Sequence, residues 1–433
     1  MKSVQDQINN TPMSGFQVLA VTVCLAINML DGYDVLVMSF TAPFVAEEWA
    51  LSQIVTGWLL SASLIGMALG SLFLAPLADL YGRRRMTLLS LTAVTAGMLA
   101  SAAAANYPQL IALRFFTGLG IGAMLASLTV VVSEYSSDRR RTLALIILQA
   151  GFPAGAMVWG IVAAPIILGY GWRWAFVFGG VLSGLMIPVA MAYLPESLDY
   201  LLGSRPPDTL EKVNRTLKRM GKTMVRELGN VTQAKPARAK LNHLFRHGRG
   251  RNTLLIWVCF FCTLLAFYFF MSWTPKLLID AGLSEGAGLS GGIILNAGAI
   301  LGGIALGLLA SRIRLNWLQS GYALMGGVLM IAFGAYAGEL VTALALAFLV
   351  GLFGTGCIMG AYAAVPQMYP PEVRTTGTGM AIGVGRWGGV AAPTVAGVLL
   401  DTGWTGPDLY FIFAIPLFVA AAAAVFLRIR KSH

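Results

Sequence analysis

Hydrophobic residues in this chain gather in twelve long runs, and short polar segments separate one run from the next. An α-helix needs roughly 20 apolar residues to cross a bilayer, and the runs reach that length. They are too long and too uniformly apolar for the strands of a membrane β-barrel. The predicted spans are residues 16–44, 53–77, 86–105, 108–133, 141–168, 173–194, 253–277, 287–310, 315–337, 340–366, 374–400 and 408–428. The pattern predicts an all-α membrane protein with twelve transmembrane helices.

The longest polar stretch of the chain lies between the sixth and seventh predicted spans. This stretch, residues 195–252, is predicted to be a central loop. It contains one amphipathic segment around residues 209–220, which either contacts lipid headgroups or forms part of a solvated linker. The loop separates an N-terminal half, residues 1–194, from a C-terminal half, residues 253–433, and each half holds six spans.

A short polar junction occurs twice, once in each half. It runs from Glu134 to Arg141 between the fourth and fifth spans, and from Gln367 to Arg374 between the tenth and eleventh, with the same spacing. A parallel repeat of this kind is typical of carriers in which two halves rock about a central solute site. The repeat therefore predicts two six-helix halves that are related by a pseudo-twofold axis along the membrane normal.

Charged residues make up only 11% of the chain, whereas soluble proteins carry about 25%. The net charge of +11 comes from basic clusters in the predicted loops, such as residues 83–85 and 139–141. Acidic residues, such as Glu47 and Asp401, dominate the loops on the other side. Because basic loops stay in the cytoplasm, this asymmetry predicts that both termini and the central loop lie there. The basic charge thus reflects topology, and we expect no nucleic-acid partner.

The sequence offers no clear site for a metal, a nucleotide or another cofactor. Cys259 and Cys262 form a CxxC within an apolar run, without a second pair or a histidine cluster. The GxGxxG from Gly383 to Gly388 lies inside a span and follows no predicted strand, and a P-loop sequence is absent. We therefore expect neither ATP-driven transport nor an enzyme, and no cofactor.

Asp31, Asp34 and Arg114 place ionisable groups inside predicted spans, where such groups are costly and usually functional. The two carboxylates are three residues apart, so they share one helical face. Poorly hydrated carboxylates this close should titrate as a coupled pair that can carry a proton across the membrane. Arg114 lies at a similar depth and must be paired. We predict a switchable pairing of Arg114 with the aspartates for proton coupling; the alternative is a purely structural ion pair.

Arg386 lies near the middle of the eleventh span and has no acidic neighbour on its own helix. Its guanidinium keeps its charge and matches the geometry of a carboxylate. We predict that Arg386 binds the carboxylate of the substrate. The alternative is a salt bridge to an acidic residue of another helix, Asp31 and Asp34 included.

Aromatic and uncharged polar residues inside the spans are candidates for the rest of the solute site. Aromatic faces stack on planar rings, and side-chain amides can bind a ring hydroxyl. The aromatic candidates are Tyr33, Phe267, Phe270 and Tyr362, and the polar candidates are Asn28, Gln149 and Asn296. The alternative for each aromatic residue is a packing or lipid-facing role, and for each amide a hydrogen bond that joins two helices.

A further set of residues lies at the predicted cytoplasmic ends of the helices. This set is Asp79, Gly82, Arg83, Arg84, Glu134, Arg141 and Arg374. Opposite charges near each other at helix ends attract one another. We predict that these residues latch the cytoplasmic gate rather than bind the solute.

Four segments resemble signatures of the major facilitator superfamily. Residues 70–85 are similar to its loop between helices 2 and 3, residues 114–122 to its helix 4, residues 195–197 to the end of its helix 6, and residues 369–379 to its junction of helices 10 and 11. The resemblance covers essentially the whole chain. It implies the twelve-helix fold of that superfamily and a role for Arg114 in proton coupling.

Within the superfamily, the run Asp31-Gly32-Tyr33-Asp34 resembles the helix 1 motif of the aromatic acid:proton symporters. That group imports benzoate, 4-hydroxybenzoate, protocatechuate and related acids into bacteria. The resemblance implies a secondary active transporter that takes up a small aromatic carboxylate with protons by alternating access. The alternatives are a carrier of another organic anion, such as muconate or nicotinate, and a membrane sensor that binds a ligand without moving it.

The same resemblance implies a multi-pass protein of the bacterial inner membrane. We expect the protein to be a monomer. Its expected partners are the aromatic carboxylate, protons and the lipid bilayer.

Overall fold

The computed structural model describes residues 4–9, 11–204, 208–225, 244–245, 249–310, 312–369 and 371–427. Nearly all of these residues are in helices, and none of them forms a strand. Much of the basic central loop, residues 226–243, lies outside the described part. For Arg374 only the backbone is described, so the predicted gate contact of its side chain stays a prediction.

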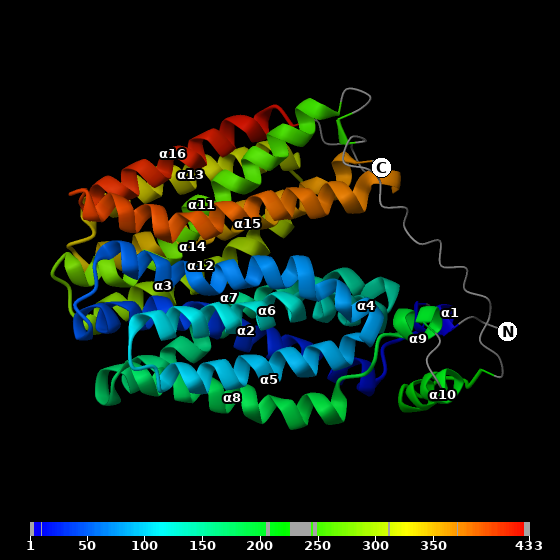
Figure 1. Cartoon of the computed structure of the whole chain (residues 1–433). Helices are drawn as coiled ribbons and strands as arrows, with labels where there is room; N and C mark the ends of the chain where they lie inside the picture. Colours follow the sequence, from blue (N-terminus) through cyan, green and yellow to red (C-terminus); the bar gives the residue numbers. More distant parts are fainter. Residues whose placement is uncertain are drawn as a thin grey trace. The chain divides into compact units, whose positions relative to one another are not determined.

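Eleven helices are long and apolar enough to cross a membrane (Figure 1). They are α2 (Gly15–Glu48), the span Gln53–Tyr81 that begins with α3 (Gln53–Leu69), α5 (Arg83–Ala102), α6 (Tyr107–Tyr135), α7 (Asp138–Tyr170), α8 (Trp172–Tyr193), α11 (Gly250–Asp280), α12 (Glu285–Leu309), α13 (Leu315–Tyr336), α14 (Leu340–Met368) and α16 (Gly406–Val425). The twelfth long helix is α15 (Pro371–Asp401), which carries Arg386 and several glycines. The predicted all-α fold with twelve transmembrane helices is confirmed.

The second span changes its helical form near the end. After α3, the chain makes a π-helical turn, η1 (Gly70–Leu74), a 3-10 turn, η2 (Ala75–Leu77), and the short helix α4 (Ala78–Tyr81). Pro76 lies within this stretch, and a proline cannot donate to the helical ladder. Gly82 then ends the segment with a φ of 96°, a conformation that favours glycine.

The chain forms two compact units, and four helices contribute to both. Unit 1 comprises Met1–Val35, Ile65–Gly155 and Arg173–Lys235, and unit 2 comprises Leu36–Leu64, Ala156–Trp172 and Pro236–His433. The boundaries pass through α2, α3 and α7, so each of these helices has one segment in each unit, and the first residue of α8, Trp172, belongs to unit 2. The division by sequence into two halves and a central loop is a different one and stays a prediction.

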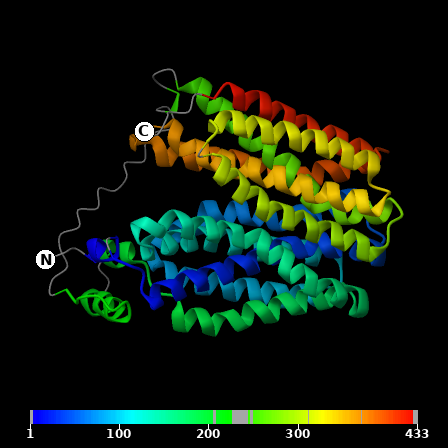
Figure 2. The ribbon, with the colours of Figure 1, turned by 180° about the vertical axis from the view of Figure 1, so that it is seen from behind.

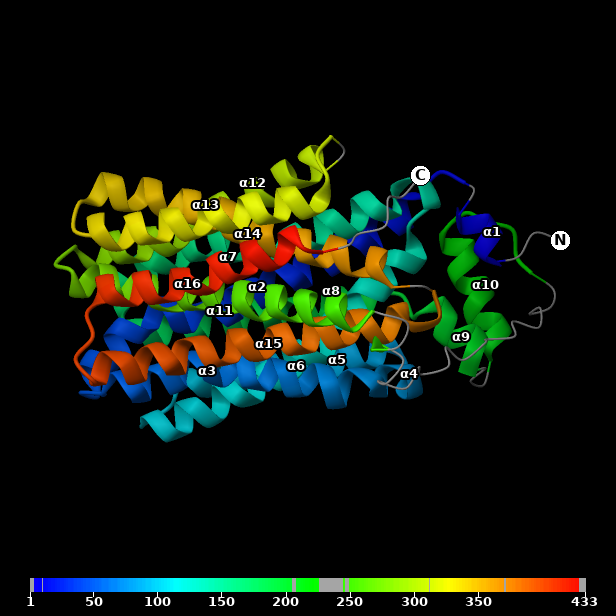
Figure 3. The same ribbon diagram turned by 90° about the horizontal axis from the view of Figure 1, so that it is seen from above.

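Unit 1 is built around α5 and α6, which pack along each other (Figure 1). The short helices α1 (Val4–Asn9), α9 (Leu198–Ser204) and α10 (Thr209–Arg219) gather at one end of this unit (Figures 1 and 3). The amphipathic helix predicted in the central loop is therefore present as α10. Its apolar face is buried, because Val213 and Leu217 join a hydrophobic cluster of unit 1.

Unit 2 pairs its helices along their lengths. The helix α12 packs on α14, α13 packs on α16 (Figure 2), and α11 packs on α15 (Figure 3). The core between α11, α13 and α16 is aromatic: Phe269 stacks on Phe413 with ring centroids 4.1 Å apart, and Phe270 meets Phe333 and Tyr410 edge-on. Such ring pairs stabilise a core beyond the area that they bury.

Glycines allow α3 and α15 to approach closely within unit 2. A Cβ added to Gly57 would lie 2.6 Å from the Pro393 carbonyl oxygen, and one added to Gly397 would lie 2.4 Å from that of Gln53. At the end of this seam, the Asp401 carboxylate accepts hydrogen bonds of 3.0 Å from the backbone N–H groups of Gln53 and Ile54. Asp401 thereby satisfies free donors at the first turn of α3.

Candidate functional site

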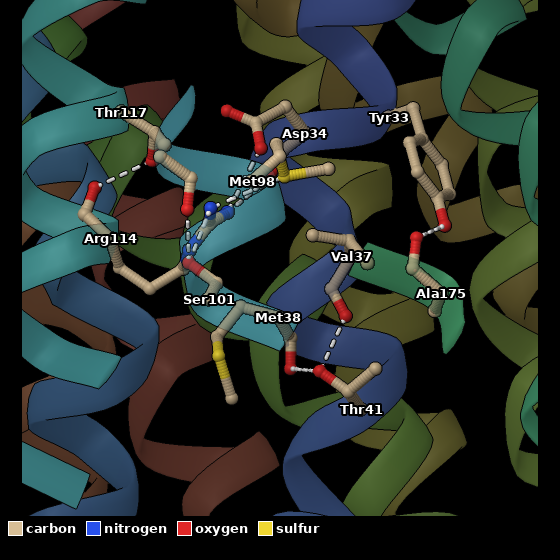
Figure 4. Close-up of polar contacts among 11 residues, drawn as sticks. Tyr33, Asp34, Val37, Met38, Thr41, Met98, Ser101, Arg114, Thr117 and Ala175 are labelled. Carbon is tan, nitrogen blue, oxygen red and sulfur yellow. Dashed lines mark hydrogen bonds and ion pairs between the residues drawn. The ribbon is translucent and has the colours of Figure 1, made fainter. Parts of the chain in front are cut away.

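The Arg114 guanidinium forms the most completely enclosed charge cluster of unit 1 (Figure 4). Its side chain is 0% exposed, and its Nη1 lies 2.9 Å from Asp34 Oδ1. Its Nη2 donates to Ser101 Oγ at 3.1 Å and to Met98 Sδ at 3.2 Å. The Phe176 ring lies 4.8 Å from the guanidinium carbon, within cation–π range. The protein itself therefore supplies partners for this charge from α2, α5 and α8.

Asp31 lies one helical turn before Asp34 and is equally buried, at 2% exposed. Among the described residues it makes no ion pair, and its Oδ2 has no hydrogen-bond partner. Asp34 Oδ2 also has no partner, because Arg114 contacts the other oxygen. The cluster thus contains two buried carboxyl groups but a single cation, which pairs with Asp34. This imbalance is relieved when one carboxyl group holds a proton.

The two middle residues of the Asp-Gly-Tyr-Asp run fix α2 among its neighbours. A Cβ added to Gly32 would lie 2.0 Å from the Phe152 carbonyl oxygen, so glycine is required where α2 crosses α7. Tyr33 turns to α8, where its hydroxyl donates to the Ala175 carbonyl at 2.9 Å (Figure 4). Its side chain is 1% exposed and packs edge-on to Phe178. This packing favours an anchoring role for Tyr33 over contact with a solute.

The three polar candidates differ in their surroundings. Asn28 is 1% exposed and donates through Nδ2 to the Leu148 carbonyl of α7 at 2.5 Å. Asn296 is equally buried, but it donates to the Gly292 carbonyl of its own helix, α12. The side-chain oxygens of both asparagines are buried without a partner. Gln149 is exposed on α7.

Arg386 lies in α15 of unit 2 and is half-buried. Its charge acts on two phenol groups, those of Tyr268 on α11 and Tyr362 on α14. The α15 backbone beside it passes close to α11, because a Cβ on Gly388 would lie 2.3 Å from the Phe261 carbonyl oxygen. Three helices thus bring a guanidinium and two phenols together, which is a suitable set for an aromatic anion.

The aromatic candidates of unit 2 fall into two groups. Tyr362 is 41% exposed and meets the Phe260 ring edge-on at 5.1 Å. Phe267 is 9% exposed and lies beside Gly354 of α14. Phe270 is 0% exposed and belongs to the aromatic core described above. That position favours a packing role for Phe270 rather than contact with a solute.

The predicted gating residues contact one another and the end of α8 within unit 1. Asp79 pairs with Arg83 one turn later, at 2.9 Å. The Arg84 backbone N–H donates to Glu196 Oε1 at 3.0 Å, and its guanidinium donates to the Met191 carbonyl. A Cβ on Gly82 would lie 2.6 Å from Glu196 Oε2, so this glycine makes room for the carboxylate.

Glu134 and Arg141 also have partners within unit 1. Glu134 accepts hydrogen bonds from Ser197 Oγ at 2.8 Å and from the Leu198 backbone N–H at 2.7 Å, at the start of α9. Arg141 contacts Asp138 at 2.9 Å and donates to Asn9 Oδ1 at 2.7 Å. These contacts tie α6, α7, α9 and α1 together, and a gating role for the set stays a prediction.

Several residues of these clusters were not identified from the sequence. Ser101 and Met98 lie in an apolar run, and no charge or motif in the sequence distinguishes them. They contact Arg114 only because α5 packs on α6. Glu196 carries part of the superfamily resemblance but was given no role, although it joins Arg84 to the end of α8. Tyr268 stood inside an aromatic run and could not be separated from its neighbours.

The fold and these clusters define a class of protein. Twelve membrane-spanning helices enclose ionisable groups that a purely structural membrane protein would avoid, which is the construction of a solute carrier. A family model described as the Major Facilitator Superfamily matches residues 23–359. The chain belongs to the Major Facilitator Superfamily, and it is a membrane transporter rather than an enzyme.

Two relatives and one solved structure illustrate the match. The chain is 32% identical to a 4-hydroxybenzoate transporter of Pseudomonas putida, over 98% of this chain and 95% of that protein. It is 33% identical to a gallate transporter of Pseudomonas putida, over 97% and 94%. The crystal structure of a D-xylose-proton symporter matches with a TM-score of 0.76 at 16% identity, over 95% of this chain and 98% of that one. This last likeness concerns the fold alone.

Proposed function

We propose that this protein is a secondary transporter that takes up a small aromatic carboxylate together with protons. The observation that carries the proposal is the buried cluster of Asp31, Asp34 and Arg114, in which only one of the two carboxyl groups pairs with the cation. The relatives named as transporters of 4-hydroxybenzoate and gallate support the substrate class, because both are hydroxylated benzoates. The alternative of a membrane sensor finds no support in these relatives, which are named as transporters.

The proton is assigned to the carboxyl groups of α2. A buried carboxylate without a cation partner is costly, and a bound proton removes the cost. Asp31 is in that position, whereas Asp34 has Arg114. We infer that Asp31 takes up the proton first, and that Arg114 and Asp34 respond to the change in charge beside them. The ion pair of Arg114 is then switchable rather than purely structural.

The anion is assigned to Arg386. An arginine binds a carboxylate through two parallel hydrogen bonds, and nearby phenols can add a donor or stack on a ring. Arg386 is half-buried and lies near Tyr268 and Tyr362, so a ligand that reaches it also meets aromatic side chains. Binding a carboxylate at Arg386 neutralises that charge, as a proton neutralises Asp31. A loaded carrier therefore has a neutral Asp31 and an anion bound at Arg386, which lowers the cost of the transition through the bilayer.

The orientation follows from the loop charges. Arg83, Arg84 and Arg141 lie at one end of their helices, with the basic central loop, and we propose that this end faces the cytoplasm of a bacterial cell. Asp401 and the α3–α15 seam then belong to the outer side, where we propose that they close the outer gate. Both termini are cytoplasmic in this arrangement.

The experiment uses the purified full-length protein in proteoliposomes with labelled 4-hydroxybenzoate. We expect accumulation that depends on an imposed inward pH gradient, and loss of that accumulation in Asp31→Asn and Asp34→Asn. Asp208→Asn is the matched control, because Asp208 is exposed and has a φ of 61°, which asparagine tolerates. Uptake that ignores the pH gradient would exclude proton coupling.

A competition series separates the candidate substrates. Unlabelled benzoate, 4-hydroxybenzoate, protocatechuate and gallate should each inhibit uptake of the labelled acid, in an order set by their ring hydroxyls. Stronger inhibition by nicotinate or muconate than by all four would move the protein to the alternative of a carrier for another organic anion. Neutral phenols without a carboxylate should not compete, because they lack the partner of Arg386.

A further inference from the structure

One face of α2 presents three buried oxygen atoms that have no hydrogen-bond donor. They are Asn28 Oδ1, Asp31 Oδ2 and Asp34 Oδ2, and all three residues are at most 2% exposed. The residues are spaced by three along the helix, so neighbouring side chains lie on the same face. Buried acceptors normally have a partner, and each one left without costs about 1–3 kcal/mol. Three in a row therefore call for a shared explanation.

The orientation of the Asn28 amide is set by α7. Its Nδ2 donates to the Leu148 carbonyl at 2.5 Å, and the reverse orientation would bring two acceptor oxygens together. Oδ1 is therefore the free end of the amide. A carboxylate at Asp31 cannot donate to it, because an ionised carboxylate is only an acceptor. A protonated Asp31 carboxyl group, by contrast, has one O–H donor.

We propose that Asn28 is a positioning residue for the transported proton, because its side-chain oxygen accepts a hydrogen bond from the protonated carboxyl group of Asp31. The proton comes from the water of the side to which the site is open, binds Asp31 Oδ2, and leaves as the same proton on the other side. No other bond forms or breaks. The proposal rests on the proposed function, since it names the group that holds the proton in place.

The charged neighbours of Asp31 are consistent with this role. On its own helix it faces Asp34, and the cation packed against that residue from α6 is Arg114, which Asp34 and Ser101 engage. The described residues of α5 and α8 around this cluster contribute Met98, Ser101 and Phe176, which are uncharged, and the Tyr33 phenol beside Asp34 donates to the Ala175 carbonyl. Asn28 is therefore the neutral acceptor next to Asp31. It stabilises only the protonated form of Asp31, because an ionised carboxylate has no proton to donate.

The hydrogen bond would also connect the proton to α7. Asn28 is fixed to Leu148, and α2 and α7 touch further along, where a Cβ on Gly155 would lie 1.9 Å from the Met29 carbonyl oxygen. Protonation of Asp31 then adds a hydrogen bond to the Asn28 side chain, which is already bound to α7. Release of the proton removes this hydrogen bond. The protonation state of Asp31 on α2 thus reaches α7 through the Asn28 amide.

The test compares Asn28→Leu with Gln17→Leu in proteoliposomes. Gln17 is the matched control, because it also donates its amide from α2 to a backbone carbonyl, that of Tyr135 at 2.9 Å, but far along the helix from the carboxyl groups. The readouts are gradient-driven uptake of labelled 4-hydroxybenzoate as a function of external pH, and exchange of substrate in the absence of a gradient.

We expect Asn28→Leu to lower the pH of half-maximal uptake by about half to one unit, as a roughly three- to tenfold loss of proton affinity requires. Exchange without a gradient should continue. Gln17→Leu should leave the pH profile in place. An unchanged profile in Asn28→Leu, or an equal shift in Gln17→Leu, would overturn the proposal. If wild-type protein shows no gradient-driven uptake, the proposed function fails instead.

A second measurement needs neither a substrate nor a well-folded leucine variant. Asn28→Ala also withdraws the acceptor, because alanine has no side-chain oxygen, and it adds no volume to the site. Asp31→Asn supplies a permanent amide donor and therefore mimics the protonated carboxyl group. It should raise the thermal midpoint of wild-type protein at neutral pH, and this gain should be lost in the Asn28→Ala background. An equal gain in both backgrounds would contradict the hydrogen bond.

Discussion

Arg114 and Arg386 both lie well inside membrane-spanning helices, but they occupy different environments. Arg114 in unit 1 is fully enclosed and has an aspartate, a serine, a methionine and a phenylalanine ring around it. Arg386 in unit 2 is half-buried on a glycine-rich helix, and its charge acts on two phenols. The same side chain is thus enclosed among protein partners in one place and half-exposed in the other.

This difference separates two tasks of a coupled carrier. An enclosed ion pair cannot be reached by a bulky solute, but a proton can alter its balance by neutralising a neighbouring carboxylate. An accessible guanidinium can exchange partners with an entering carboxylate. The comparison therefore assigns the proton to the region of Arg114 and the anion to Arg386, and four substitutions test this assignment.

The largest effect is expected from Arg114→Ala. It leaves Asp34 as a buried carboxylate without its cation, and breaking such a pair costs about 3–5 kcal/mol. Both the free energy of unfolding in detergent and gradient-driven uptake should fall sharply. Adding Asp34→Asn should recover much of the stability but not the coupling. Exposed Arg140 provides the control Arg140→Ala, which should be nearly neutral. A variant as stable as wild type would mean that the pair contributes little.

Arg386→Gln should act on affinity rather than on stability. The loss of a charge-assisted contact corresponds to substrate binding that is weaker by about 10- to 100-fold. Because Arg386 is half-buried, the thermal midpoint should change little. Arg386→Lys keeps the charge but not the paired donors, so its affinity should be intermediate. Direct binding of labelled 4-hydroxybenzoate measures this, and undiminished affinity in Arg386→Gln would remove the assignment.

A smaller effect is expected from Gly388→Ala, which perturbs the position of Arg386 without touching its charge. The added Cβ would meet the Phe261 carbonyl oxygen, so α11 and α15 must separate slightly. Overpacking of this kind costs about 1–3 kcal/mol, and affinity should fall several-fold. Gly383→Ala on the same helix is the control, because nothing lies within 4 Å of its added Cβ. Equal substrate affinity of the two variants would show that the contact between α11 and α15 does not position Arg386.

The smallest effect is expected from Tyr33→Phe. This variant removes the hydrogen bond to the Ala175 carbonyl and keeps the packing on Phe178, at a cost of about 0.5–1.5 kcal/mol. Substrate affinity and the pH profile should be unchanged. A marked loss of affinity, with the thermal midpoint preserved, would return Tyr33 to the solute site and blur the separation of the two regions.

The candidate site could be predicted from the sequence only in part. Asp31, Asp34, Arg114 and Arg386 were found because charge inside an apolar run is conspicuous. The aromatic candidates were harder, because helices that are apolar all round carry no stripe that marks the inner face. Phe270 therefore stood beside Phe267 in the sequence, although it packs in the aromatic core of unit 2.

The sequence by itself determined the twelve spans, the asymmetry of the loops and the few charges within the membrane. These properties are local, since hydropathy depends on neighbours along one helix. Only the tertiary structure decided that Arg114 takes Asp34 and leaves Asp31 without a cation, and that Tyr33 turns to α8. Those outcomes depend on the rotation of each helix about its axis and on its neighbours in space. Close approaches at glycines such as Gly32 set both the rotation of a helix and its neighbours.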